Sequence, residues 1–453
     1  MTQNLVGCPR DLGDGLVLRW ATTDDVDQLV AFNTTVHADG PEQPATKVGA
    51  WVADLLGGRH PVVTPADFTV VVDTEALENG KQKLVSSLTL FSQTWRYDGI
   101  EFGFGQPELV GTLPGYRRRG LIRAQMDAVH ELSRSRGELV QGITGIPWYY
   151  RLFGYEMTVN LGGGRSLLWA RQGKDALKPH STYRMRAATL DDVPLLQELY
   201  ARATRHSHLC WARSEAMLVH MMTGQQQASD KYREFRIVEE EGSESELGEL
   251  LGYYVLEQRR SGYRVNEVAV AEGKSMRELG LFIAGSLGQE AEAYNAGVGK
   301  PITAVNFGLG EEHPLYTALG NQLERLDQPY AWYMRVPDVA AFLTHVQPVL
   351  ERRLRASVMA GHSGELKLNL MQSYFKLQFE KGSFVKIAPY EPNAFYDGDV
   401  FLPDQTFLHL LFGHRTIAEL NSVRKDCWAK GVETNVLMDA LFPKQPASIR
   451  DFV

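Results

Sequence analysis

Glu108-Leu-Val-Gly-Thr-Leu-Pro-Gly-Tyr-Arg-Arg-Arg-Gly-Leu-Ile-Arg-Ala-Gln-Met126 is the most informative stretch of this chain. An apolar extended run enters a basic turn, which opens directly into a segment with helical spacing of apolar residues. At a helix start the main-chain N–H groups are unpaired and the helix dipole favours negative charge. Three arginines add fork-shaped donors for phosphate oxygens, and Gly120 lets the backbone approach a ligand closely. The stretch therefore predicts a phosphate-binding turn between a strand and a helix.

The spacing Arg117-x-x-Gly120-x-Ile122 resembles the Arg/Gln-x-x-Gly-x-Gly/Ala signature with which GNAT N-acetyltransferases bind the pyrophosphate of coenzyme A. Ile122 departs from that pattern, since a small residue is usual there, so the loop or the approach of the ligand differs slightly. A solvated basic turn is the alternative interpretation, because charged turns are common. The flanking strand and helix, and the later Tyr149-Tyr-Arg-Leu-Phe-Gly-Tyr155, favour coenzyme A.

The resemblance implies that coenzyme A contacts the end of the strand and the turn. The residues expected to bind it are Val110, Thr112, Leu113, Arg117, Arg118, Arg119, Gly120, Leu121 and Ile122. A main-chain N–H between Val110 and Leu113 can polarise the thioester carbonyl, because Pro114 and Gly115 suggest that the strand ends or splays there.

Length and composition set the broad class. At 453 residues the chain is too long for one core, and about 150 residues per domain suggests three domains. Hydrophobic residues make up 44% and charged residues 23%, with no run near the roughly 20 apolar residues of a membrane span. The N-terminus lacks the pattern of a signal peptide, which predicts a cytoplasmic protein.

Charge and cysteine content narrow the partners. The net charge of -8 disfavours nucleic acid and mildly favours cationic substrates. Cys8, Cys210 and Cys427 are scattered along the chain, so neither a disulfide framework nor a zinc site is expected. His206-Ser-His-Leu-Cys210 has too few convergent donors for a metal site, and no metal is expected.

An internal repeat organises the first two thirds of the chain. Arg19-Trp-Ala-Thr-Thr-Asp-Asp-Val26 recurs as Arg186-Ala-Ala-Thr-Leu-Asp-Asp-Val193. Tyr150-Arg-Leu-Phe-Gly154 is mirrored more weakly by Tyr316-Thr-Ala-Leu-Gly320, and the offset from Tyr150 to Tyr316 is almost the same as that from Arg19 to Arg186. Two pairs of segments with nearly one offset indicate a duplicated domain.

Each copy is expected to mix helices and strands. Thr and Asp in the repeat can cap a helix, and β-branched runs predict strands at Phe68–Asp73, Lys83–Leu90 and Leu139–Thr144. The second copy lacks an Arg-x-x-Gly turn around Val268–Arg277, so we expect a scaffolding role for it. This order of elements is consistent with two tandem GNAT folds, the second degenerate, in a mixed α/β (α+β) protein.

The final third begins near Val336, where a helical run leads into the alternating strands Gly364–Leu370 and Tyr374–Glu380. Its ending, with Leu410-Leu-Phe-Gly-His-Arg415, resembles a sterol-carrier-protein-like domain. The whole chain is similar to the enhanced intracellular survival (Eis) family of acetyltransferases. That resemblance implies a catalytic GNAT domain at 1–175, a degenerate GNAT-like domain at 176–335 and a sterol-carrier-like domain at 336–453.

The Eis resemblance implies two catalytic groups. The tyrosine three residues before Phe-Gly-Tyr acts as general acid in that family, which here is Tyr150. The family also uses its terminal carboxylate as general base, which here belongs to Val453. From spacing alone, the aromatic cluster around Tyr150 favours a packed core residue, and a chain terminus is usually frayed. The family usually ends in an aromatic residue, so Val453 is a departure from its pattern.

The expected function is an acetyl-coenzyme A-dependent N-acetyltransferase. The resemblance suggests a primary amine acceptor, such as an aminoglycoside or a polyamine-like molecule, and a homo-oligomer such as a hexamer. Acceptor contacts are expected from the first helix and the segment after it, about Phe32 to Trp51. The alternative is a protein that carries an apolar ligand in its last domain, with a vestigial or sensory coenzyme A site.

Overall fold

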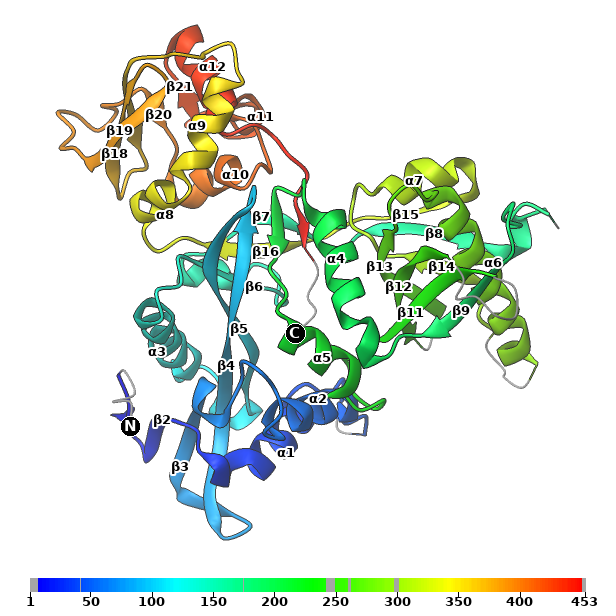
Figure 1. The fold of residues 1–453 in the computed structure, drawn as a ribbon. Helices are drawn as coiled ribbons and strands as arrows, with labels where there is room; N and C mark the ends of the chain where they lie inside the picture. Colours follow the sequence, from blue (N-terminus) through cyan, green and yellow to red (C-terminus); the bar gives the residue numbers. More distant parts are fainter. Residues whose placement is uncertain are drawn as a thin grey trace.

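The computed structural model describes residues 7–40, 42–173, 175–241, 249–259, 262–296 and 301–449. These residues form three separate β-sheets that are accompanied by helices (Figure 1). The mixed α/β architecture predicted from the sequence is confirmed. Within the same ranges, no helix combines the length and the apolar character that crossing a membrane requires.

The first sheet holds the stretch that opens the sequence analysis. Its strand order is β1-β2-β3-β4-β5-β6-β16-β7-β22, and β10 pairs with β4. The strands are β1 (Arg10–Asp11), β2 (Leu16–Trp20), β3 (Phe68–Glu78), β4 (Lys81–Tyr97), β5 (Ile100–Thr112), β6 (Val140–Ile143), β7 (Glu156–Leu161), β10 (Leu209–Trp211), β16 (Tyr330–Arg335) and β22 (Ser448–Ile449). The helices packed on this sheet are α1 (Val26–Val36), α2 (Thr46–Leu56) and α3 (Leu121–Ser135). The three strands predicted in this part of the chain fall in β3, β4 and β6.

Helix α3 follows from its sequence pattern. Leu121, Met126 and Val129 are buried against the sheet, while Arg123 on the opposite face is exposed. The helix ends before Gly137, whose φ of 73° is the left-handed conformation common just after a helix. The predicted helix start after Gly120 is confirmed.

The sequence repeat corresponds to a repeated local structure. In the first copy Asp25 closes a capping box with Thr22 and accepts hydrogen bonds from the Arg19 guanidinium at 2.7 Å. In the second copy Asp192 does the same with Arg186, at 2.7 and 2.8 Å. Each ion pair ties a strand to the helix start that follows it.

The second sheet has the order β15-β8-β14-β13-β12-β11-β9. Its strands are β8 (Gly164–Leu168), β9 (Tyr183–Ala187), β11 (Glu234–Glu240), β12 (Leu250–Arg259), β13 (Gly262–Val270), β14 (Ala304–Phe307) and β15 (Arg325–Asp327). The helices of this region are α4 (Val193–Thr204), α5 (Glu215–Thr223), α6 (Met276–Asn295) and α7 (Pro314–Leu319).

Four strands pair outside the order of the chain, and one of them is β10 of the second copy, which pairs with β4 of the first sheet. β8 precedes the second copy of the repeat but pairs with β14 and β15 of the second sheet. β16 follows the second copy but lies between β6 and β7 of the first sheet. β22, which follows the third sheet, returns to pair in parallel with β7 (Figure 1). The first sheet is therefore completed by segments from the middle and the end of the chain.

The third sheet has the order β19-β18-β17-β20-β21. Its strands are β17 (Gly364–Asn369), β18 (Tyr374–Glu380), β19 (Ser383–Pro389), β20 (Val400–Phe401) and β21 (Trp428–Ala429). Its helices are α8 (Val339–His345), α9 (Gln347–Arg355), α10 (Phe407–Leu411), α11 (Ile417–Val423) and α12 (Gly431–Leu441). The alternating strands and the helical run predicted for this region are confirmed as β17, β18 and α9.

Candidate active site

The first sheet opens where β5 separates from β6. The two strands pair in parallel only at Phe104 and Gly105 of β5, and β5 continues alone on that side to Thr112. Further along, the pairing of β5 with β4 shifts register around Leu109, whose φ is 53°. A bulge of this kind bends the strand and redirects its main-chain groups. The result is a gap along the outer edge of β5.

The basic turn and the start of α3 lie at the end of this gap. Gly120 caps the helix with a φ of 75°, and a Cβ there would meet no protein atom within 4 Å. The first intrahelical hydrogen bond runs from the Ala124 N–H to the Gly120 carbonyl, so the N–H groups of Leu121 to Arg123 precede the helical ladder. Open space, unpaired donors and nearby guanidinium groups suit a phosphate. The residues therefore fit the pyrophosphate of coenzyme A.

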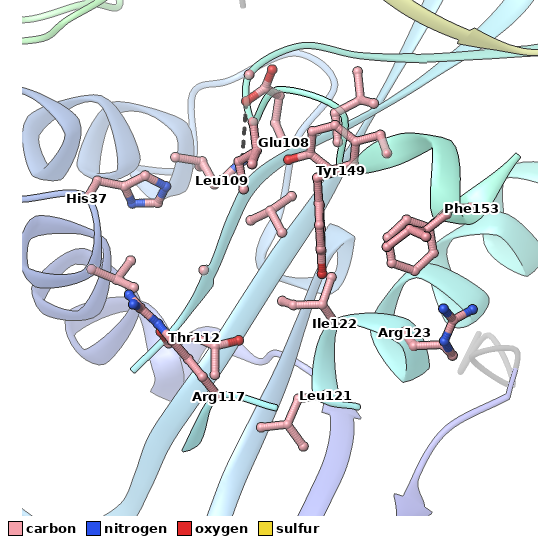
Figure 2. A pocket seen from close by; sticks show the side chains of 18 of the residues that line it. His37, Glu108, Leu109, Thr112, Arg117, Leu121, Ile122, Arg123, Tyr149 and Phe153 are labelled. Atoms are coloured by element: carbon pink, nitrogen blue, oxygen red, sulfur yellow. Dashed lines mark hydrogen bonds between the residues drawn. The ribbon is translucent and has the colours of Figure 1, made fainter. Parts of the chain in front are cut away.

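A cavity of about 810 Å³ joins the gap to the turn (Figure 2). Of the residues predicted to bind coenzyme A, seven line it, namely Val110, Thr112, Arg117, Arg118, Gly120, Leu121 and Ile122. Leu113 and Arg119 do not. Leu113 is partly buried against the core, and the Arg119 guanidinium lies 5.3 Å from the centre of the Tyr116 ring.

Tyr150 lines the same cavity from the short 3-10 helix Tyr150–Phe153. Its side chain is 2% exposed, and its ring packs edge-on against Tyr149 and Tyr333. Burial, followed by the Glu108 carboxylate, raises the pKa of the Tyr150 hydroxyl. The phenol is therefore neutral at physiological pH and can donate a hydrogen bond into the cavity.

The loop that carries Tyr150 is held by a residue far along the chain. The Trp148 N–H donates a hydrogen bond to the Tyr333 hydroxyl, which itself donates to the Ile146 carbonyl at 3.3 Å. Tyr333 belongs to β16, the strand inserted beside β6. Sequence reasoning missed Tyr333 because no local pattern links residue 333 to residue 150.

The predicted catalytic carboxylate of Val453 lies outside the described residues. The described part of the tail ends in β22, where Ile449 pairs with Leu161 of β7. The Ile449 carbonyl also accepts a hydrogen bond from the Trp332 indole at 2.9 Å. The terminal segment thus returns from the third sheet to the first.

The cavity contains polar groups that the sequence analysis did not assign. Glu108 lines it and accepts hydrogen bonds from Gln106 at 3.0 Å and from the Leu109 N–H at 3.3 Å. Tyr149 and His37 line it as well. Burial lowers the pKa of the His37 imidazole, although a hydrogen bond to the Asn33 carbonyl opposes this, so the ring is neutral at pH 7. The available signal was the place of Glu108 at the start of the stretch Glu108–Met126, near the end of β5.

The two ends of the cavity differ in charge. Arg117 and Arg118 border the end near α3, whereas Glu108 lies at the other end of the β5 segment, as Figure 2 shows for Arg117 and Glu108. Val36, Val48 and Trp51 line the wall formed by α1 and α2. They fall within the segment from which acceptor contacts are expected. In the described part of the chain, no group of three or more His, Cys, Asp or Glu side chains is placed to hold a metal ion.

Comparisons with known proteins agree with this geometry. Residues 18–158 match the family model of the acetyltransferase (GNAT) domain. Residues 18–158 form a GNAT acetyltransferase domain. The matched range contains the bulged strand, the basic turn, α3 and Tyr150, and GNAT enzymes use acetyl-coenzyme A as acetyl donor. A search of curated protein sequences gave no significant match.

Solved structures resemble this chain over almost its full length. A GCN5-related N-acetyltransferase from Kribbella flavida covers 96% of this chain and 97% of its own, with a TM-score of 0.64 and 18% identity. A probable N-acyltransferase from Enterococcus faecalis covers 97% and 100%, with a TM-score of 0.68 and 12% identity. Eis1 from Mycobacterium abscessus covers 95% and 98%, with a TM-score of 0.57 and 13% identity. At these identities the matches establish a shared Eis-like, multi-domain fold.

Proposed function

We propose that the protein transfers the acetyl group of acetyl-coenzyme A to a primary amine at the cavity beside β5. The observation that carries the proposal is the continuity of this cavity. It runs from a cationic helix start, suited to pyrophosphate, to a carboxylate, suited to an ammonium group. Acetyl-coenzyme A supplies an activated acyl group, and the residues of the chain position it and manage the protons.

The acceptor must lose a proton before or during attack. An alkylamine with a pKa near 10.4 is neutral in only about one molecule in several thousand at pH 7. Glu108 and the apolar wall of Val36 and Trp51 can hold the ammonium form and its carbon skeleton. A base in or near the cavity then takes the proton.

Tyr150 is proposed as a hydrogen-bond donor to the departing sulfur. A thiol of this type has a pKa of about 8.5, and a phenol has one of about 10 even before burial raises it. Full proton transfer from Tyr150 to the thiolate is therefore unfavourable, whereas a hydrogen bond stabilises the developing negative charge. Within the described residues the Tyr150 hydroxyl makes no other hydrogen bond, so it is available for this role.

The terminal carboxylate of Val453 is proposed as the base, with Glu108 as the second candidate. Val453 is the fourth residue after Ile449, and an extended chain spans at most about 3.3 to 3.6 Å per residue, so its carboxylate can reach at most roughly 14 Å from Ile449. The anchoring of β22 on the first sheet supports this assignment, because it brings the tail to the catalytic sheet.

The proposals for the domain boundaries, the location in the cell, the oligomeric state and the acceptor rest on the family resemblance. We propose the domain boundaries 1–175, 176–335 and 336–453, a cytoplasmic homo-oligomer such as a hexamer, and an aminoglycoside or polyamine-like acceptor. The alternative of an apolar carrier is not favoured. The cavity of about 660 Å³ in the third region is bordered by polar groups, including Asp338, Gln372 and Gln405.

Thiol release measured with acetyl-, propionyl- and succinyl-coenzyme A against a panel of amines tests the activity. Amine-dependent release that is fastest with acetyl-coenzyme A is expected. If coenzyme A binds but none of the amines accelerates thiol release, the proposed function is wrong.

A second experiment separates the two candidate bases. Adding one alanine after Val453 converts its carboxylate to an amide and should lower turnover by about 10²-fold. Glu108→Gln should lower turnover less and should mainly raise the KM of the amine. The reverse pattern would assign the base to Glu108.

A further inference from the structure

A second cavity, of about 260 Å³, lies between α4, β13 and the terminal segment that carries β22. It is built from the same elements as the first cavity. Val36 and His37 at the end of α1 line the first, while Ala203 and Thr204 at the end of α4 line the second. The offset from Val36 to Ala203 is identical to that from Arg19 to Arg186 in the sequence repeat. The second cavity is therefore the counterpart of the first in the duplicated fold.

The strand geometry that opens the first cavity is also present in the second copy. β13 pairs in parallel with β14 only over Tyr263 to Val265. Beyond that point the pairing of β13 with β12 shifts register at Asn266, as β5 shifts against β4 near Leu109. Asn266 and the two residues after it line the second cavity. The second copy thus retains the gap in its sheet although it lacks the arginine turn.

The lining of the second cavity is acidic. Glu267, Glu311 and Glu312 contribute carboxylates, and within the described residues no lysine or arginine lines it. Glu267 is balanced from behind by the buried Arg213, at 3.3 Å. Glu311 accepts a hydrogen bond from Asn160, and both Glu311 and Glu312 are exposed to solvent. These two carboxylates leave a net negative charge at the cavity.

The remaining walls are apolar and the space is small. Trp211, Leu309 and Ile449 supply apolar surface. The volume is below the roughly 300 to 1,000 Å³ typical of sites for drug-sized ligands. Negative charge combined with apolar walls suits a compact organic cation better than an anion or a nucleotide.

We propose that this cavity is a second binding site, specific for a small aliphatic amine. The proposal stands on the second cavity alone and does not require acetyl transfer at the first. Binding there would also act on the tail, because Asn160 contacts Glu311 through its side chain and the Ala447 carbonyl through its N–H. A bound amine would therefore stabilise the pairing of β22 with β7.

Titration calorimetry with putrescine, in the absence of coenzyme A, tests the site. Ala203→Trp fills the cavity from an exposed helical position and should remove one class of binding site or weaken it at least tenfold. Ala201→Trp, on the same helix but outside the lining, is the matched control and should bind like the wild type. The double variant Glu311→Gln/Glu312→Gln should weaken the same class by at least tenfold, because it removes both solvent-exposed carboxylates that would pair with the ammonium group.

Glu108→Gln distinguishes this site from the first cavity. This substitution should not change putrescine binding at the second cavity, which is the binding that Ala203→Trp removes or weakens. Putrescine binding that is lost in Glu108→Gln but identical in Ala203→Trp and Ala201→Trp would overturn the proposal. The absence of binding to the wild type at millimolar putrescine would overturn it as well.

Discussion

The starts of α3 and α6 occupy equivalent places in the two copies but differ in how their first turns are satisfied. Gly120 caps α3 with no side chain, and its surroundings are open. Ser275 caps α6 by accepting a hydrogen bond from the Glu278 N–H at 3.3 Å. The Glu278 carboxylate in turn accepts a hydrogen bond from the His180 N–H at 2.6 Å. In the second copy, side chains of the protein itself therefore satisfy the start of the helix and place a carboxylate there, which disfavours binding of an external anion.

The two tyrosines at the weaker repeat show the same contrast. The Tyr316 hydroxyl donates to the Phe307 carbonyl at 2.8 Å and accepts from the Leu309 N–H at 3.0 Å. Tyr150, by contrast, borders the large cavity beside β5. The comparison indicates that a duplicated catalytic group becomes structural once its polar atoms find partners within the protein.

Tyr150→Phe should produce the largest effect. Losing a hydrogen-bond donor to the departing sulfur should lower kcat by about 10²- to 10³-fold, with little change in coenzyme A affinity. Steady-state kinetics and a binding titration measure the two quantities. Tyr149→Phe is the control in the first copy, and Tyr316→Phe should affect thermal stability but not turnover. An unaltered kcat in Tyr150→Phe removes the assigned role.

Gly120→Asp should weaken coenzyme A binding by about 10²-fold, because it places a carboxylate at the helix start, as Glu278 does in the second copy. Gly120→Asn is the matched control, since asparagine has nearly the same shape, tolerates a positive φ and carries no charge. Its affinity should fall by less than tenfold. Equal losses in both variants would mean that backbone strain, and not charge, controls binding.

Arg117→Ala and Arg118→Ala should each weaken coenzyme A by about tenfold, as expected for a charge-assisted hydrogen bond worth about 1.5 kcal/mol. Arg119→Ala should change affinity less, because Arg119 lies over the Tyr116 ring and does not line the cavity. Binding of a pantetheine fragment without the pyrophosphate should be unaffected in all three. A fragment that loses affinity in parallel contradicts the phosphate role.

Asp25→Asn and Asp192→Asn should produce the smallest effects, of about 1 to 2 kcal/mol in stability, because each capping box and ion pair is lost. The hydrogen bond from Arg186 is the main factor that lowers the pKa of Asp192 to about 2. A carboxyl group with a lowered pKa contributes stability that is present above about pH 4 and is lost as the pH falls toward 2. Melting temperatures measured from pH 7 downward should therefore converge for Asp192→Asn and the wild type. A difference that persists below pH 2 would contradict this origin.

The structural features that depend on residues close together in the chain were predicted from the sequence. The end of β5, the arginine turn and the start of α3 are encoded in one short continuous stretch, so spacing and composition were enough to place them. Val36 and Ala203 are separated by the same offset as the two copies of the repeat, so their equivalence could be read from the sequence. The sequence did not show that both residues line cavities, because this depends on the fold.

The unpredicted parts depend on contacts between distant segments. Tyr333 positions the Tyr150 loop only because β16 inserts between β6 and β7, and no local pattern in residues 330–335 encodes that pairing. The bulge at Leu109 likewise depends on the register against β4, which is set by the two strands together. The residues around the reacting groups are therefore predicted less well from sequence than the element that binds the phosphates.

The exchange of β8 and β16 between the two sheets has a consequence for the history of the protein. A fragment ending before residue 330 would lack the strand that joins β6 to β7, and a fragment beginning after residue 168 would lack the one that joins β14 to β15. Either half alone would expose unpaired strand edges, which invite aggregation. Once the strands had been exchanged, the two copies could diverge in chemistry but could no longer be inherited separately.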